Sequence, residues 1–191
     1  MPPHSPALDF LLTRRSRPIR SLTAPGPDRD TLRTLLTAAA RVPDHGKLEP
    51  WRFVVLDRPA LSRVAEQVAD HAAAQGFDPE KSAKGRDAYD ISPLAVVVVA
   101  SPKPADKIPA IEQTLSAGAV CAALVNAALA EGWGACWLTG WPAHDPVLAQ
   151  AAFGLAPGEW VAGIVHIGRE TSTPPDRPRP DLDRIVTWVS E

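Results

Sequence analysis

Apolar residues recur at helical spacing in the first third of the chain. Between Leu32 and Ala39 they fall at positions i, i+3, i+4 and i+7, which predicts a helix from about residue 29 to 41. Asp28 follows the chain breaker 24–27 and is well placed to cap that helix. Leucines at 8, 11 and 12 mark a shorter helix before it.

The run from Leu94 to Ala100 is apolar at every position and is bounded by prolines at 93 and 102. This composition is typical of a strand that other elements cover on both faces. Weaker patterns predict strands at 52–56, 134–138 and 160–167, helices at 60–75 and 110–131, a short helix from the Asp145 cap to about Phe153, and a segment at 185–189 that could add to a sheet edge. These elements form an α+β sandwich in which helix predominates.

The segment 114–130 carries no charge and approaches the length of a membrane-spanning helix, which takes about 20 residues. It is rich in alanine and glycine, contains Asn126, and is flanked by Glu112 and Glu131 in place of lysine or arginine. We therefore expect a soluble helix. Its small residues from Ser116 to Ala123 favour close packing on all sides, including against a partner subunit.

The composition is that of one soluble globular domain. The 191 residues are 45% hydrophobic, and 20 Lys and Arg balance 22 Asp and Glu, so nucleic acid is not an expected partner. Cys121 and Cys136 form no C-x-x-C motif, and the N-terminus has no signal-peptide pattern, which favours a cytoplasmic protein with buried, unreactive thiols. We predict one domain over 1–191, with 170–191 as an extended C-terminal arm in which four prolines exclude regular structure over 171–180.

Several enzyme classes lack their motifs here. The sequence has no P-loop, no H-E-x-x-H and no G-x-S-x-G, and its five histidines show no metal-ligand spacing. Gly132-Trp-Gly134 could begin a dinucleotide-binding motif, but Trp137 occupies the position of the third glycine. We expect no metal site, NTPase, Rossmann dehydrogenase or serine hydrolase.

Three segments remain as candidates for chemistry. Arg14-Arg15-Ser16, at the end of the first helix, offers two guanidinium groups and a hydroxyl, which suit a phosphate. A solvated basic helix end is the alternative interpretation. The loop with Arg41, His45 and Lys47 presents hydrogen-bond donors that suit a flavin ring and its ribityl chain, although a plain helix–strand connection would look similar.

The third segment is Gly132-Trp-Gly-Ala-Cys-Trp137-Leu-Thr139-Gly140-Trp141, which includes a predicted strand. Glycine allows a flat ligand to approach the backbone, and tryptophan supplies a planar apolar wall. Tryptophans that only fill the core are the alternative.

In combination, the three segments resemble the nitroreductase family, in particular a branch of short proteins with a Pro-Asp-His-x-x-x-x-Pro-Trp loop. The likeness begins at Arg14-Arg15-Ser16 and continues through the loop from Ala39 to Trp51. It extends over Glu112-Gln-x-x-Ser116-Ala-Gly, Gly132-x-Gly-x-x-Trp137 and Ile167-Gly168. The family implies a central, mostly antiparallel sheet flanked by helices, and a homodimer with shared active sites.

The resemblance also implies FMN as cofactor, NAD(P)H as co-substrate and a set of binding residues. The phosphate and the ribityl chain would be contacted by Arg14, Arg15 and Ser16, with Arg177 and Arg179 as a C-terminal basic pair at the phosphate. Arg41 and His45 would reach the flavin from the partner subunit. The isoalloxazine ring would lie along Trp137, Leu138, Thr139 and Gly140. Two positions depart from the family pattern. Lys47 stands where asparagine is usual, and Pro18 stands where a basic residue is frequent.

The activity implied is the reduction of nitroaromatic or quinone-like acceptors by ping-pong hydride transfer through flavin N5, with no catalytic side chain required. Two alternatives remain open. One is a flavin-consuming or dehalogenating member of the same superfamily. The other is a non-enzymatic flavin carrier or sensor.

Overall fold

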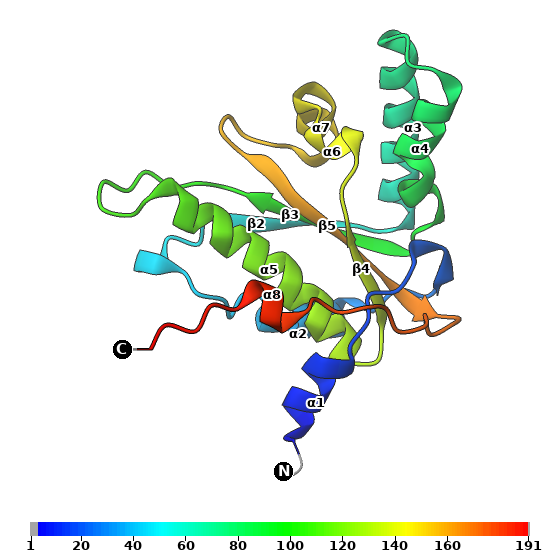
Figure 1. The fold of residues 1–191 in the computed structure, drawn as a ribbon. Helices are drawn as coiled ribbons and strands as arrows, with labels where there is room; N and C mark the ends of the chain where they lie inside the picture. The colour runs from blue at the N-terminus through cyan, green and yellow to red at the C-terminus, as the bar shows by residue number, and fades with distance from the viewer. Residues whose placement is uncertain (1–3, 191) are drawn as a thin grey trace.

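The computed structural model describes residues 4–190, which form helices around one sheet (Figure 1). The α-helices are α1 (Pro6–Thr13), α2 (Arg29–Ala39), α3 (Arg58–Ala74), α4 (Pro79–Ile91), α5 (Ala110–Ala130), α6 (Trp141–His144), α7 (Pro146–Phe153) and α8 (Leu182–Ile185). Two 3-10 turns, η1 (Ile19–Ser21) and η2 (His45–Lys47), accompany the strands β1 (Leu22–Thr23), β2 (Trp51–Leu56), β3 (Leu94–Ala100), β4 (Gly134–Leu138) and β5 (Trp160–Glu170).

The sheet is antiparallel at every pairing. β3 lies between β2 and β5, with Val97 opposite Val54 on one side and Ile164 on the other. β4 pairs with the far edge of β5, and β1 pairs with the end of β5 beyond β3. All seven residues of β3 are buried, which confirms the prediction of a strand covered on both faces.

Two helical layers cover the sheet (Figure 1). α2 and α5 pack on the face that carries Val96 and Val98. α3, α4, α6 and α7 supply the core on the opposite face, where Val97 and Val99 point. The alternation of side chains along β3 thus feeds two separate cores, and the predicted α+β class with a mostly antiparallel sheet is confirmed.

Among residues 4–190, α5 is the one helix long and apolar enough to cross a membrane by length and composition. Its packing accounts for that composition, because Val120, Cys121 and Leu124 are fully buried under the sheet. Ile111 and Leu115 lie on the other side of the helix and are 60% and 65% exposed. The predicted burial of the helix on all sides is therefore not met within one chain.

Both cysteines are buried, as predicted, and desolvation raises the pKa of each thiol to about 12. Other expectations need correction. Sequence patterns missed α4, because only Gly85 and Tyr89 of its 13 residues are buried and no apolar stripe marks it. The expectation of an edge strand at 185–189 is wrong for the single chain: Ile185 ends α8, and the residues after it are exposed and unpaired with the sheet.

Candidate functional site

The end of α1 turns the chain toward the sheet at the predicted phosphate motif. Arg14 caps the helix by donating its backbone N–H to the Phe10 carbonyl at 2.8 Å. Three residues later, the Arg17 amide donates to the Ala135 carbonyl at 2.9 Å, which ties the motif to β4. Arg14, Arg15 and Ser16 are thereby held beside the first residues of that strand.

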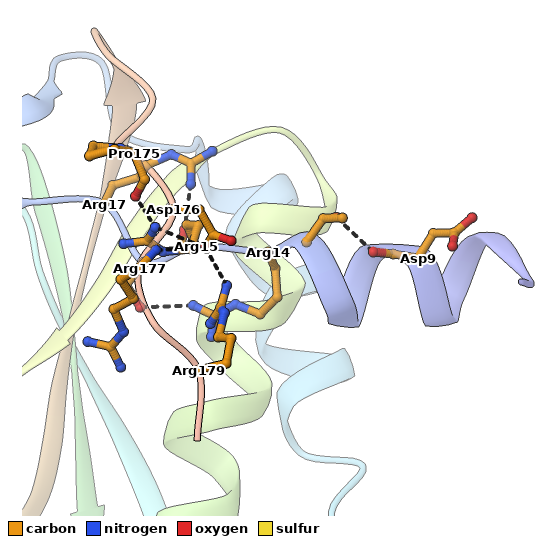
Figure 2. Close-up of polar contacts among 10 residues, drawn as sticks. Asp9, Arg14, Arg15, Arg17, Pro175, Asp176, Arg177 and Arg179 are labelled. Atoms are coloured by element: carbon orange, nitrogen blue, oxygen red, sulfur yellow. Dashed lines mark hydrogen bonds and ion pairs between the residues drawn. The ribbon is translucent and has the colours of Figure 1, made fainter. Parts of the chain in front are cut away.

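The C-terminal arm returns to the same place after β5. A guanidinium nitrogen of Arg15 donates to the Pro175 carbonyl and lies 3.4 Å from the Asp176 carboxylate. Arg179 donates to the same carboxylate at 3.0 Å. Figure 2 shows Asp176 among the arginines, with the side chain of Arg179 beside Arg14.

These contacts create a basic cavity. Five residues predicted from separate ends of the sequence line a cavity of about 140 Å³: Arg14, Arg15, Ser16, Arg177 and Arg179. Residues 171–181 of the arm form no helix or strand, as the prolines predicted, and side-chain contacts hold them here, whereas α8 follows at Leu182–Ile185.

The charges of this cavity are poorly balanced. Within residues 4–190, Arg15 and Arg179 share the single carboxylate of Asp176, Arg17 pairs with Glu170, and Arg14 has no acidic partner. Burial, and then repulsion from Arg179 and the other nearby arginines, lowers the pKa of Arg14.

One atom of the cavity lacks a partner altogether. Arg14 Nη2 donates to Ser16 Oγ at 2.8 Å, but Arg14 Nε is buried with no hydrogen bond. A buried donor without an acceptor is costly, at about 1–3 kcal/mol. An anionic oxygen placed in this cavity would remove that cost.

The segment 137–140 leads away from the basic cavity along β4. Trp137 and Leu138 point to opposite faces of the sheet, because side chains alternate along a strand. Trp137 lies over Gly163 of β5, whose lack of a Cβ makes room for the indole, and it is 41% exposed. Trp137 therefore presents a flat aromatic surface on one face of the sheet, and Leu138 points to the other face.

Leu138, Thr139 and Gly140 open onto the other face, at a second cavity of about 190 Å³. Its remaining wall comes from η1, from β5 and above all from α4: Ile19, Lys84, Gly85, Asp87, Ala88, Tyr89, Pro142, Ile164 and His166. Ser16 lines the basic cavity and Ile19 lines the second one, so three residues of chain connect the two cavities.

None of the α4 residues was predicted as part of a site. The available signal was Asp78-Pro79, since Asp78 caps the helix by accepting from the Lys81 amide at 2.8 Å and proline favours the first helical position. Only the tertiary packing of α4 against η1 shows that its residues face Thr139.

The loop with Arg41, His45 and Lys47 lies elsewhere in the chain. His45 Nδ1 is 2.7 Å from Glu112 Oε2, in the first turn of α5. Arg17 instead contacts Ala135, beyond the last turn of α5. A helix of 21 residues is about 30 Å long, so the two groups of predicted residues lie at opposite ends of it (Figure 1).

This loop has an unusual backbone. Lys47 and Glu49 have φ angles of 55° and 46°, in the left-handed region that residues other than glycine rarely adopt. Asp44 fixes them by accepting from the amides of Leu48 at 3.1 Å and Glu49 at 2.8 Å. Sequence patterns marked the loop as polar but missed Asp44 as the residue that sets its shape.

Similar proteins give the family. The nitroreductase family model matches residues 11–169. The chain is 34% identical over 162 residues to the Escherichia coli K12 protein named "Putative NAD(P)H nitroreductase YdjA". The aligned residues are 85% of this chain and 87% of that protein. A Haemophilus influenzae protein named "Putative NAD(P)H nitroreductase" is 36% identical over 165 residues, which are 85% of this chain and 87% of that protein.

Solved structures agree on the fold. A nitroreductase-like family protein from Bacillus cereus superposes with a TM-score of 0.81 at 24% identity, over 99% of this chain and 98% of that one. An FMN-bound nitroreductase from Bacteroides fragilis gives a TM-score of 0.74 at 20% identity, over 98% of this chain and all of the other. With a family model over most of its length and relatives above 30% identity, this chain belongs to the nitroreductase family.

Proposed function

We propose that the protein is an FMN-dependent NAD(P)H oxidoreductase that reduces nitroaromatic or quinone-like acceptors. The observation that carries the proposal is the basic cavity, where Arg14 Nε is buried without an acceptor among arginines that outnumber the nearby carboxylates. The relatives named as NAD(P)H nitroreductases and the FMN-bound structural neighbour support the same cofactor and co-substrate.

The residues of the chain fit FMN from one end to the other. Arg14, Arg15, Ser16, Arg177 and Arg179 would hold the phosphate, because guanidinium groups bind phosphate oxygens in pairs. The ribityl chain would follow from Ser16 toward Ile19. The ring would lie along Trp137–Gly140, where one cavity adjoins the backbone.

Bound FMN supplies hydride exchange at N5, first with NAD(P)H and then with the acceptor. The chain would bind and orient FMN: the arginines would hold the phosphate and the segment 137–140 would hold the ring edge. Gly140, which has no side chain, would let the flavin ring approach the backbone. We assign no side chain a proton transfer. One site beside 137–140 would receive NAD(P)H and the acceptor in turn, which would give ping-pong kinetics.

We also propose a cytoplasmic homodimer with shared sites. The exposed side of α5, with Ile111 and Leu115, is apolar and bordered by small residues. Two copies packed about a two-fold axis, with their α5 helices antiparallel, would bring the His45 end of one helix to the Arg17 end of the other. Arg41, His45 and Lys47 would then complete the partner's site.

The test is an absorbance spectrum of the purified protein, followed by anaerobic titration with NADH and with NADPH. We expect a flavin spectrum and its bleaching by at least one nicotinamide. A carrier would bind FMN but oxidise NADPH no faster than free flavin. A flavin-consuming or dehalogenating enzyme would release product from FMN itself or from a halogenated phenol. A protein that takes up no FMN contradicts the proposal.

A further inference from the structure

Two buried polar side chains form the floor of the cavity beside Leu138–Gly140. Tyr89 from α4 is 3% exposed and His166 from β5 is 1% exposed, yet both line this cavity. Within residues 4–190, Tyr89 Oη and His166 Nε2 make no hydrogen bond, and neither belongs to the buried polar atoms that lack a partner, so both atoms reach the cavity. The cavity therefore presents two unpaired polar atoms that are available to the polar edge of a ligand.

The surroundings fix what His166 can offer. Ser92 Oγ donates its hydrogen to the Leu94 carbonyl at 2.9 Å, so it can only accept from His166 Nδ1, which lies 2.9 Å away. Nδ1 therefore carries the ring hydrogen. Burial lowers the pKa of His166 to about 4, which keeps the ring neutral at physiological pH. Nε2 then faces the cavity as an acceptor.

Tyr89 complements it as a donor. Burial raises the pKa of its phenol well above the ordinary value, so the hydroxyl keeps its hydrogen. Arg58 holds the end of α4 in place by donating to the carbonyls of Tyr89 and Ser92, each at 2.6 Å. The Tyr89 donor is therefore held in place on α4, and the His166 acceptor is held in place on β5.

The charges near the cavity are already paired. Asp87 accepts from Arg20 at 2.8 Å, and Lys84 lies 2.7 Å from Glu80. A charged ligand would find no free counter-charge here and would be costly to bury. At about 190 Å³ the cavity also lies below the size of pockets that enclose a whole drug-sized ligand, roughly 300–1,000 Å³, so it suits one edge of a ring.

We infer that His166 and Tyr89 recognise the pyrimidine edge of the flavin, with His166 Nε2 accepting from N3–H and Tyr89 Oη donating to a neighbouring carbonyl. The inference rests on the proposed function. Oxidised isoalloxazine has a single ring N–H, at N3, between the carbonyls at C2 and C4. A neutral edge with one donor flanked by acceptors matches a cavity with one acceptor beside a donor.

The experiment compares FMN with 3-methyl-FMN, in which a methyl group replaces the N3 hydrogen. Dissociation constants are measured by flavin fluorescence for the wild type, His166→Leu and Tyr89→Phe. The wild type should bind 3-methyl-FMN at least about tenfold more weakly than FMN, since a buried acceptor loses its donor. In His166→Leu, the affinity for FMN should fall and the tenfold preference should disappear. Tyr89→Phe should weaken both flavins while keeping the preference.

His144→Leu, an exposed histidine on α6, is the matched control and should leave both constants unchanged. Should His166→Leu fail to fold, ¹⁵N NMR of histidine-labelled wild type gives the same answer, because FMN but not 3-methyl-FMN should shift the His166 Nε2 resonance. If the wild type binds FMN but His166→Leu keeps the same preference for FMN over 3-methyl-FMN, the inference alone is overturned. The same holds if the two flavins have the same effect on the Nε2 resonance. A wild type that binds neither flavin overturns the proposed function with it.

Discussion

Arg14 and Ser16 are joined by a hydrogen bond of 2.8 Å from Nη2 to Oγ, while Nε of the same guanidinium is buried without a partner. The bond holds the Arg14 side chain in one position, so its free donor has a fixed direction. The neighbouring arginines add positive potential at that point. A side chain held this way is organised before an anion arrives, which reduces the entropy lost on binding.

Arg14→Ala should therefore weaken FMN binding by about 1.5–3 kcal/mol, the range for a hydrogen bond to a charged group. Riboflavin, which has no phosphate, should lose far less. Fluorescence titrations with both flavins measure the two changes. Arg63→Ala, an exposed arginine on α3, is the control and should change neither. Equal losses for FMN and riboflavin would show that Arg14 does not hold the phosphate.

A separate ion pair joins β2 to the turn before β5. Arg52 donates to Glu159 through Nε at 2.9 Å and through Nη2 at 2.7 Å, and its Nη2 also donates to the Gly154 carbonyl at 2.7 Å. The Glu159 side chain is only 8% exposed. Hydrogen bonds from Arg52 lower the pKa of Glu159 from 4.5 to about 2.

Because the folded pKa of Glu159 is depressed, its contribution to stability is full above the unfolded pKa and is lost as the pH falls toward 2. Arg52→Met should lower the free energy of unfolding at pH 7 by about 2 kcal/mol. The difference from wild type should shrink steadily from about pH 4.5 downward. Urea unfolding at several pH values measures it. A difference that stays constant down to pH 2.5 would rule out this linkage.

The elements that could be predicted are those whose own residues carry the pattern. Leu94–Ala100 is apolar at every position because it is buried on both faces, and Asp28 and Asp145 cap their helices as their side chains indicate. α4 could not be found by periodicity, since Gly85 and Tyr89 are its only buried residues and do not form an apolar stripe.

The site was predictable only in parts. Arg14 and Arg179 are 165 positions apart, and resemblance alone assigned them to one site; in the structure both line one cavity. The acceptor role of His166 depends on Ser92 and Leu94, far away in the sequence, so no local pattern could indicate it.

If NADPH and the acceptor use one binding position at the flavin in turn, steady-state kinetics should be ping-pong. We expect parallel double-reciprocal plots when NADPH is varied at several fixed concentrations of nitrofurazone or menadione. The first product must leave before the acceptor binds, because both substrates use the same position. Intersecting lines would mean that the two substrates bind together and that the position is not shared.

The shared site can be tested by mixing two inactive variants, Arg14→Ala and Arg41→Glu. Each variant alone should lose most activity, the first through the phosphate and the second through the loop that reaches the partner. The two are unfolded together and refolded, and native mass spectrometry confirms that heterodimers form. Activity against menadione is then compared with that of each variant refolded alone.

If Arg14 and Arg41 of one site come from different chains, a heterodimer has one site with both changes and one site with neither. Activity should then return, to at most about a quarter of the wild-type value per chain in an equal mixture, since half of the dimers are mixed and half of their sites are intact. The roughly 30 Å length of α5 separates the two residues within a chain and favours this outcome. If both residues served the same chain's site, every site in the mixture would carry one change, and heterodimers would remain inactive.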